Sequence, residues 1–183
     1  MKRRLFIQLP FAAGALPALA SDQSNSVGEG FKVGSGHDRF DDEMNIMGGQ
    51  FHCKVSGKDS NGQLLIYETF RHEKGGPAYH LHHEQDEWFY VMKGEFLVKV
   101  GEQTFNLKPG DSAFAPRKIP HAFAMTSDGE GQMMVLFQPA GTMEDFFHQM
   151  QKLGSAIPKD QEIKLKQLWA DHGMQIVGPP LKF

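Results

Sequence analysis

The stretch that decides the fold runs from residue 78 to residue 94 and reads AYHLHHEQDEWFYVMKG. Successive side chains of a β-strand alternate between its two faces, so His80 and His82 point the same way and bring two imidazoles to one side of a strand. Glu87 begins an alternating run that predicts a second strand, and the lysine-glycine pair at its end predicts a tight hairpin turn. The sequence therefore predicts two imidazoles and a carboxylate on neighbouring strands.

A second stretch, GDSAFAPRKIPH over residues 110–121, ends in another histidine, His121. The spacing H-x-H-x4-E-x6-G in the first stretch resembles the first motif of the cupin superfamily, and G-x5-P-x4-H in the second resembles the other cupin motif. Among cupins, the chain is most similar to single-domain proteins that resemble quercetin dioxygenase. The resemblance covers nearly the whole chain after residue 20. It implies an all-β fold, a small antiparallel β-barrel of the double-stranded β-helix or jelly-roll type, with C-terminal helices.

The resemblance implies a mononuclear metal site formed by His80, His82, Glu87 and His121. Three imidazole nitrogens and one carboxylate oxygen suit one divalent transition metal ion per chain, and Fe(II), Mn(II), Co(II), Ni(II), Cu(II) and Zn(II) all accept such a set of donors. One or two coordination positions stay open, as a catalyst requires. The sequence does not choose among these metals.

Two classes of function follow from such a site. In the first, the protein resembles quercetin dioxygenase and is a metal-dependent oxidoreductase: Glu87 acts as the catalytic base that accepts a proton from a substrate hydroxyl, and dioxygen then reacts with the anion. In the second, the metal serves only as a Lewis acid, in an isomerase or in a small-molecule binding module. The identity of the metal separates the two classes, because Zn(II) has no redox chemistry.

The substrate pocket is expected to be aromatic, since the chain contains fifteen phenylalanines. Strand alternation should turn about half of the candidate positions toward the metal. These candidates are Ala78 or Tyr79, Phe89 or Tyr90, Phe96, Phe114, Phe123 and Phe137. Such a pocket suits a small planar or phenolic substrate better than a sugar, although each ring taken singly could equally belong to the ordinary core.

Other polar residues near the motifs have simpler interpretations. His83 should face outward or toward the loop, and His72 precedes a turn at residues 75–77. Asp86 would be a ligand only if the strand register slipped by one residue. Lys118 stands where the second cupin motif usually has glycine. Its cation either faces the mouth of the barrel and an anionic substrate or is solvated on the loop.

The N-terminus reads as an export signal. Residues 2–4 are basic, residues 5–16 are mildly apolar, and the A-x-A pattern at residues 18–20 predicts cleavage after Ala20. The paired arginines and the weak hydrophobicity favour twin-arginine export to the periplasm or beyond, and the apolar stretch is too short and interrupted to span a membrane. Removing residues 1–20 takes away three positive charges, so the formal net charge changes from −3 to −6. That balance argues against a nucleic-acid partner and leaves a small molecule as the expected one.

One globular domain is expected after the signal. Residues 21–30 form a flexible lead-in, residues 31–140 the cupin barrel, and residues 141–183 a helical extension packed on the barrel. The single cysteine, Cys53, excludes an internal disulfide and is expected to be a small buried residue. Exposed strand edges and a phenylalanine-bearing pair of C-terminal helices predict a homodimer.

The secondary structure is expected to consist of short strands followed by two helices. The strands are expected at residues 51–57, 63–70, 79–83, 87–92, 95–100, 103–107, 112–115, 121–126 and 132–138. Asn61-Gly62 signals a hairpin between the first two. Thr142 is a candidate cap for a helix over residues 143–153, and a second helix over residues 159–172 should end at Gly173.

Overall fold

The computed structural model describes residues 29–154 and 162–183. The expected signal and residues 21–28 of the expected lead-in lie outside the described residues, as does the start of the expected second helix. Contacts group residues 31–183 into one unit, to which the description below applies. In the part of the chain that the structure describes, no helix is both long enough and apolar enough to cross a membrane.

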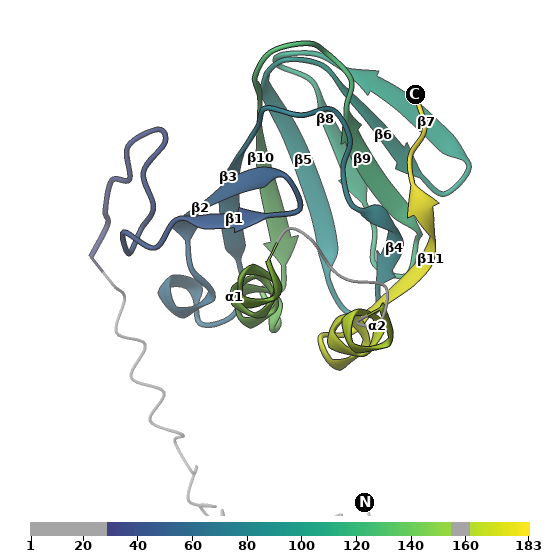
Figure 1. The fold of residues 1–183 in the computed structure, drawn as a ribbon. Coiled ribbons are helices and arrows are strands. Elements are labelled where there is room, and N and C mark those ends of the chain that lie inside the picture. The colour runs from purple at the N-terminus through teal and green to yellow at the C-terminus, as the bar shows by residue number, and fades with distance from the viewer. Residues whose placement is uncertain (1–28, 155–161) are drawn as a thin grey trace, which may run out of the picture. The chain divides into compact units, whose positions relative to one another are not determined.

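Within the described residues, eleven strands form two antiparallel sheets that face each other (Figure 1). The first sheet contains, in spatial order, β1 (Met44–Ile46), β2 (Gly49–Val55), β3 (Leu65–Arg71), β10 (Gly131–Gln138), β5 (Asp86–Lys93) and β8 (Ser112–Ala115). The second contains β11 (Met174–Pro180), β4 (Ala78–His82), β9 (His121–Met125), β6 (Phe96–Val100) and β7 (Gln103–Leu107). The all-β jelly-roll prediction is confirmed, and the expected barrel takes the form of two facing sheets.

The turns explain why the strands pair as they do. Gly101, with φ of 56°, stands in the short turn between the antiparallel neighbours β6 and β7. Gly94, with φ of 77°, stands in the short connection from β5 to β6, which belong to different sheets, so the hairpin predicted at that glycine is wrong and the turn instead carries the chain from one sheet to the other. The connection between β2 and β3 holds a short 3-10 helix, η1 (Gly57–Ser60), which is followed by Asn61 and Gly62 with φ of 52° and 78°. Positive φ is the conformation that Asn and Gly adopt at least cost, so the predicted hairpin forms at the predicted residues.

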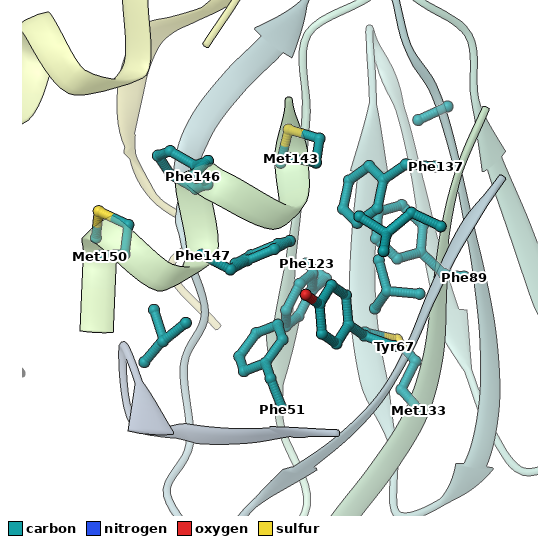
Figure 2. Close-up of a cluster of buried hydrophobic side chains, with 14 of the residues drawn as sticks. Phe51, Tyr67, Phe89, Phe123, Met133, Phe137, Met143, Phe146, Phe147 and Met150 are labelled. Atoms are coloured by element: carbon teal, nitrogen blue, oxygen red, sulfur yellow. The ribbon is translucent and has the colours of Figure 1, made fainter. Parts of the chain in front are cut away.

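The core fills the space between the sheets. Along β10, alternate residues Met133, Val135 and Phe137 are buried, as strand alternation requires. They join a cluster dominated by phenylalanine and methionine (Figure 2). Cys53 belongs to the same cluster, and burial raises the pKa of its thiol to about 12. The cysteine is therefore a protonated, apolar core residue, as expected.

Helix α1 (Met143–Leu153) covers one end of this core with its apolar face (Figure 2). The ring of Phe147 lies 5.1 Å from that of Phe51, 5.0 Å from that of Tyr67 and 5.8 Å from that of Phe137, measured between centroids. The helix starts where it was predicted to start, but the expected cap is wrong. The hydroxyl of Thr142 makes no cap hydrogen bond and instead lies 2.8 Å from Nδ1 of His172.

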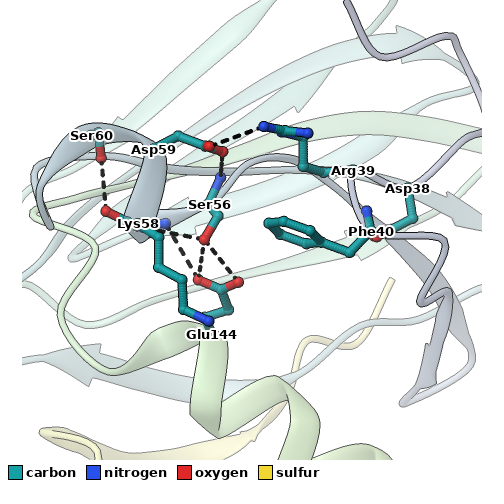
Figure 3. Close-up of polar contacts among 9 residues, drawn as sticks. Asp38, Arg39, Phe40, Ser56, Lys58, Asp59, Ser60 and Glu144 are labelled. Atoms are coloured by element: carbon teal, nitrogen blue, oxygen red, sulfur yellow. Dashed lines mark hydrogen bonds and ion pairs between the residues drawn. The ribbon is translucent and has the colours of Figure 1, made fainter. Parts of the chain in front are cut away.

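Polar contacts hold the first turn of α1 against η1 (Figure 3). The hydroxyl of Ser56 donates to the Glu144 carboxylate at 2.8 Å, and the same hydroxyl accepts from the backbone N–H of Lys58 at 3.1 Å. Asp59 completes the capping box of η1 and pairs with Arg39 at 3.3 Å. These contacts connect α1 to the β2–β3 hairpin and so fix one wall of the space between the sheets.

The end of the chain adds a second helix and a strand. Helix α2 (Glu162–Asp171) ends just before Gly173, which has φ of 72°. The chain then forms β11, which pairs with β4 so that Met174 lies opposite His82 and Ile176 opposite His80. The sequence did not predict this strand. Both helices lie at the same end of the sheets (Figure 1).

Candidate metal centre

The four residues predicted as ligands come together from three strands. His80 and His82 lie on β4 with their side chains buried, while His83, the next residue, is exposed as predicted. Glu87 stands near the start of β5, and His121 is the first residue of β9, where it pairs directly with His80. Strand alternation and one cross-strand pair therefore account for the whole cluster.

The donor atoms converge on one point. Oε2 of Glu87 lies 2.8 Å from Nε2 of His121 and 3.3 Å from Nε2 of His82. When His80 is included, each of the four residues contributes one donor atom, and these four atoms all lie within 4.8 Å of one another. Metal–nitrogen and metal–oxygen bonds of about 2.0–2.2 Å place ligand atoms at separations up to roughly twice that length. The 2.8 and 3.3 Å separations therefore fit a single ion, and a separation near 4.8 Å needs only a small inward shift.

Backbone carbonyls orient two of the imidazoles. Nδ1 of His80 lies 2.8 Å from the carbonyl oxygen of Ala78, and Nδ1 of His121 lies 2.8 Å from that of Ile119. A carbonyl only accepts, so each Nδ1 carries a proton. Nε2 of His80 therefore offers a lone pair to the centre, and Nε2 of His121 would do so once a metal replaced its hydrogen bond to Glu87. Among the described residues, neither ring nitrogen of the buried His82 has a hydrogen-bond partner. A metal ion would supply what His82 lacks.

Burial and mutual contacts set the charges of the cluster. Burial lowers the pKa of His80 to about 3, and the neighbouring His121 and His82 act in the same direction, so this ring is neutral. Burial alone would raise the pKa of Glu87, but the hydrogen bond from His121 and the close approach of the His82 ring, 3.3 Å away, outweigh it and hold the pKa below its usual value. Neutral imidazole and ionised carboxylate are the forms that bind metals.

Comparisons with known proteins agree with this geometry. A family model described as a cupin domain matches residues 67–137, which include all four clustered residues. Residues 67–137 of this chain form a cupin domain. An RmlC-like cupin from Shewanella frigidimarina superposes with a TM-score of 0.51 at 26% identity, over 65% of this chain and 96% of that one.

Two curated relatives match this cupin over shorter ranges. The 3-hydroxyanthranilate 3,4-dioxygenase 2 of Aspergillus oryzae is 26% identical over 98 residues, 51% of this chain and 55% of the relative. An uncharacterised protein of Methanocaldococcus jannaschii is 33% identical over 42 residues, 23% of this chain and 34% of the relative. The chain thus spans about half the length of the first relative and about a third of the second.

The carboxylate next to the centre of this cupin has a different role. Asp86 accepts from Arg117 three times, from its backbone N–H at 2.8 Å, from Nε at 3.0 Å and from Nη2 at 2.7 Å. The hydrogen bonds from Arg117 also lower the pKa of Asp86. Asp86 therefore holds the loop that leads to His121, and the register slip that would make it a ligand does not occur.

The same loop explains an unusual residue of the second cupin motif. Lys118 has φ of 68°, the conformation in which glycine is the usual residue, and its backbone N–H donates to the carbonyl of His82 at 2.6 Å. Its side chain is exposed. The turn that family members make with glycine is thus retained here with lysine, and it ties the strand of His82 to the loop before His121.

His80, His82 and Glu87 of the cluster line a cavity of about 40 Å³ that has mostly apolar walls. Of the predicted aromatic positions, Phe123 and Phe137 line it, while Phe89 and Phe96 are buried elsewhere in the core. The expectation for Phe114 is wrong, because its side chain is 56% exposed. That residue sits on the edge strand β8, where the outward face has no covering layer.

Sequence reasoning missed several cavity residues because other parts of the chain bring them there. The largest are Phe51 from β2, Phe146 and Phe147 from α1, and Trp169 from α2. The Trp169 ring packs on the His80 ring at 4.9 Å between centroids. Arg71, at the end of β3, also lines the cavity. The helical spacing of the phenylalanines signalled a buried face, but nothing local indicated what that face covers.

Proposed function

We propose that this cupin is a metal-dependent oxidoreductase of the dioxygenase type that acts on a small aromatic or phenolic compound. The observation that carries the proposal is the cluster of His80, His82, Glu87 and His121 donors, of which all but His121 line an aromatic-walled cavity. Four protein donors leave coordination positions free on most divalent transition metals. When bound, a redox-active ion would supply oxygen chemistry and Lewis acidity that the side chains lack.

In this proposal Glu87 takes up a proton from the substrate hydroxyl. The carboxylate is buried and ionised, and it stands beside the three imidazoles within hydrogen-bond reach of the centre. His82 and His121 cannot donate hydrogen bonds to Glu87 through nitrogens that bind a metal. Once a metal takes those nitrogens, any oxygen of Glu87 that does not bind the metal has lost its hydrogen-bond donors and is free to accept a proton. Both features suit a proton acceptor.

The apolar walls support the choice of substrate class. Phe51, Phe123, Phe137 and the α1 residues Phe146 and Phe147 present ring faces and edges to the cavity, and such surfaces bind planar compounds. The similarity to an enzyme named for oxidising 3-hydroxyanthranilate, a phenolic acid, is consistent with this class. The cavity, about 40 Å³ in this state, is smaller than a benzene-sized site of about 150 Å³. Binding therefore requires side chains of α1 or α2 to move aside.

The test combines metal loading with oxygen uptake. The protein is prepared metal-free, loaded separately with Fe(II), Mn(II), Co(II), Ni(II), Cu(II) or Zn(II), and supplied with catechols and flavonols in an oxygen electrode. We expect uptake with at least one redox-active ion and none with Zn(II). Turnover that proceeds equally well without oxygen, or with Zn(II), would instead support the isomerase class, and stoichiometric metal without any turnover would support a binding module.

A further inference from the structure

Arg71 is a buried cation that the metal chemistry does not use. It is the last residue of β3, its side chain is 3% exposed, and it lines the same cavity as His80, His82 and Glu87. Among the described residues, no carboxylate forms an ion pair with its guanidinium. Burial lowers its pKa, although arginine keeps its proton at any physiological pH. A buried charge without a partner is costly to the fold, so its presence calls for an explanation.

One part of the guanidinium has a structural role. Nη2 donates to the carbonyl oxygen of Met47 at 2.6 Å, in the turn between β1 and β2. The turn fits closely around the group, since a Cβ atom at Gly49 would lie 2.9 Å from Nη1. Nε, by contrast, is buried and has no hydrogen-bond partner among the described residues. The hydrogen bond to Met47 therefore leaves at least one N–H donor of the guanidinium available to a ligand.

The cavity offers donors and positive charge but few acceptors. Among its described lining residues the one acid is Glu87, whose carboxylate is already engaged by His82 and His121. Nε1 of Trp169, another buried donor in the lining, also has no partner among the described residues. The ligand that completes such a surface carries oxygen acceptors and negative charge.

We propose that Arg71 binds a carboxylate of the substrate, so that the preferred substrates are aromatic acids whose phenolic end faces the His80, His82, Glu87 and His121 cluster. The assignment of the phenolic end rests on the proposed function, whereas the carboxylate assignment rests on Arg71 alone. The planar fork of arginine matches the two oxygens of a carboxylate. Phe123, whose ring centroid lies 5.7 Å from Cζ of Arg71, provides an apolar wall beside the bound acid.

Calorimetry with matched ligand pairs tests this proposal without any turnover. Protocatechuate, homoprotocatechuate and dihydrocaffeate carry a carboxylate at increasing distance from one catechol ring, and the carboxamide of each is the neutral control. Each compound is titrated into metal-free and Zn(II)-loaded protein, because Zn(II) prevents oxidation. We expect at least one acid to bind on the order of tenfold to a hundredfold more tightly than its amide, the contribution of a charge-assisted hydrogen bond.

Variants then locate the preference at Arg71. Arg71→Met should remove the preference for the acid while leaving amide binding within a factor of about three, and Arg71→Lys should retain part of it. Arg117→Met is the matched control, because that arginine pairs with Asp86 outside the cavity lining and its loss should leave the preference intact. Thermal melts check that each variant folds.

Two results would overturn the proposal. The first is that every acid binds no more tightly than its amide, or that neither binds, in both metal-free and Zn(II)-loaded wild-type protein. The other is a preference that survives in folded Arg71→Met. A protein that prefers the acids but consumes no oxygen with any metal would refute the proposed function and leave this inference standing, so the two failures are distinguishable.

Discussion

Glu87 and His121, which are 34 residues apart in the chain, place Oε2 and Nε2 2.8 Å from each other in the buried centre. Glu87 belongs to the first cupin motif and His121 to the second, and neither motif alone contains a complete set of metal donors. The centre therefore exists only when β5 and β9 are both in place. This makes metal binding a sensitive measure of whether the two sheets are correctly assembled.

The first prediction concerns the histidines. His80→Ala, His82→Ala and His121→Ala should each abolish stoichiometric metal binding, because each removes one of three nitrogen donors. The metal-free variants should stay folded, with a free energy of unfolding within about 2 kcal/mol of the wild type, since most of the core lies away from these rings. Elemental analysis and thermal melts measure both. His83→Ala, at the exposed neighbouring position, should keep full occupancy, and full occupancy in any of the three ligand variants would contradict the assignment.

A second prediction separates the two roles of Glu87. With metal restored to saturation, Glu87→Gln should still turn over about two to four orders of magnitude more slowly than the wild type, because an amide can coordinate but cannot accept the proton. Steady-state assays on the substrate found by oxygen uptake give the comparison. Asp86→Asn, one residue away, should lose less than tenfold. Near-normal turnover of metal-saturated Glu87→Gln would leave Glu87 with a structural role only.

The third prediction concerns acid stability and a second buried carboxylate. Burial alone would raise the pKa of Glu68, but hydrogen bonds from Lys54, the backbone N–H of Gly36 and Gln132 outweigh it, so the pKa falls below its ordinary value of 4.5. Lys54 lies 2.6 Å from the carboxylate. A lowered folded-state pKa means that Glu68 stabilises the protein fully above pH 4.5 and loses that contribution as the pH falls through the folded-state value.

Denaturant unfolding at several pH values tests this effect. At pH 7, Glu68→Gln should lower the free energy of unfolding by about 3 kcal/mol, because it breaks a buried, hydrogen-bonded ion pair. The difference between variant and wild type should shrink as the pH falls below about 4, where the carboxyl of the unfolded wild type is protonated. A difference that stays constant down to pH 3 would show that Glu68 acts through packing and not through its charge.

Assembly gives the fourth prediction. The phenylalanines of α1 are buried in the core, so the strand edges alone remain as a basis for the expected homodimer. Phe105 of β7, Phe114 of β8 and Ile119 are 38%, 56% and 39% exposed and line one surface hollow at the edges of both sheets. We expect light scattering at micromolar concentration to give twice the chain mass, and Phe114→Glu to give a monomer. A wild-type mass equal to one chain at all concentrations would rule out the dimer.

The parts of this molecule that were predictable are those fixed by local rules. Alternation placed His80 and His82 on one face. Glycines in turns marked where most of the strands from β4 to β10 begin and end, to within about two residues. The same rules placed Glu87 on the following strand, but the set of four ligands that includes His121 came from the resemblance to cupins. The family resemblance supplied the pairing between the motifs.

The unpredicted parts depend on contacts between distant segments. β11 is a strand because it pairs with β4, and its own sequence, MQIVGPP, contains two prolines and a glycine that disfavour a strand. Arg71 continues the alternation of β3 into the core, where an apolar residue is the usual choice. Its burial becomes intelligible only when the cavity it lines is seen, which no local pattern reveals.

The contact between Trp169 and His80 gives the protein a built-in optical probe. The chain has two tryptophans, and the other one, Trp88, stacks on Tyr90 away from the cavity lining. The indole of Trp169 stands edge-on to an imidazole of the centre, at 4.9 Å between centroids and an angle of 81°. A paramagnetic ion held by that imidazole quenches the emission of the nearby indole far more than that of Trp88. Loading and loss of the ion can therefore be followed by intrinsic fluorescence, in real time and without a label.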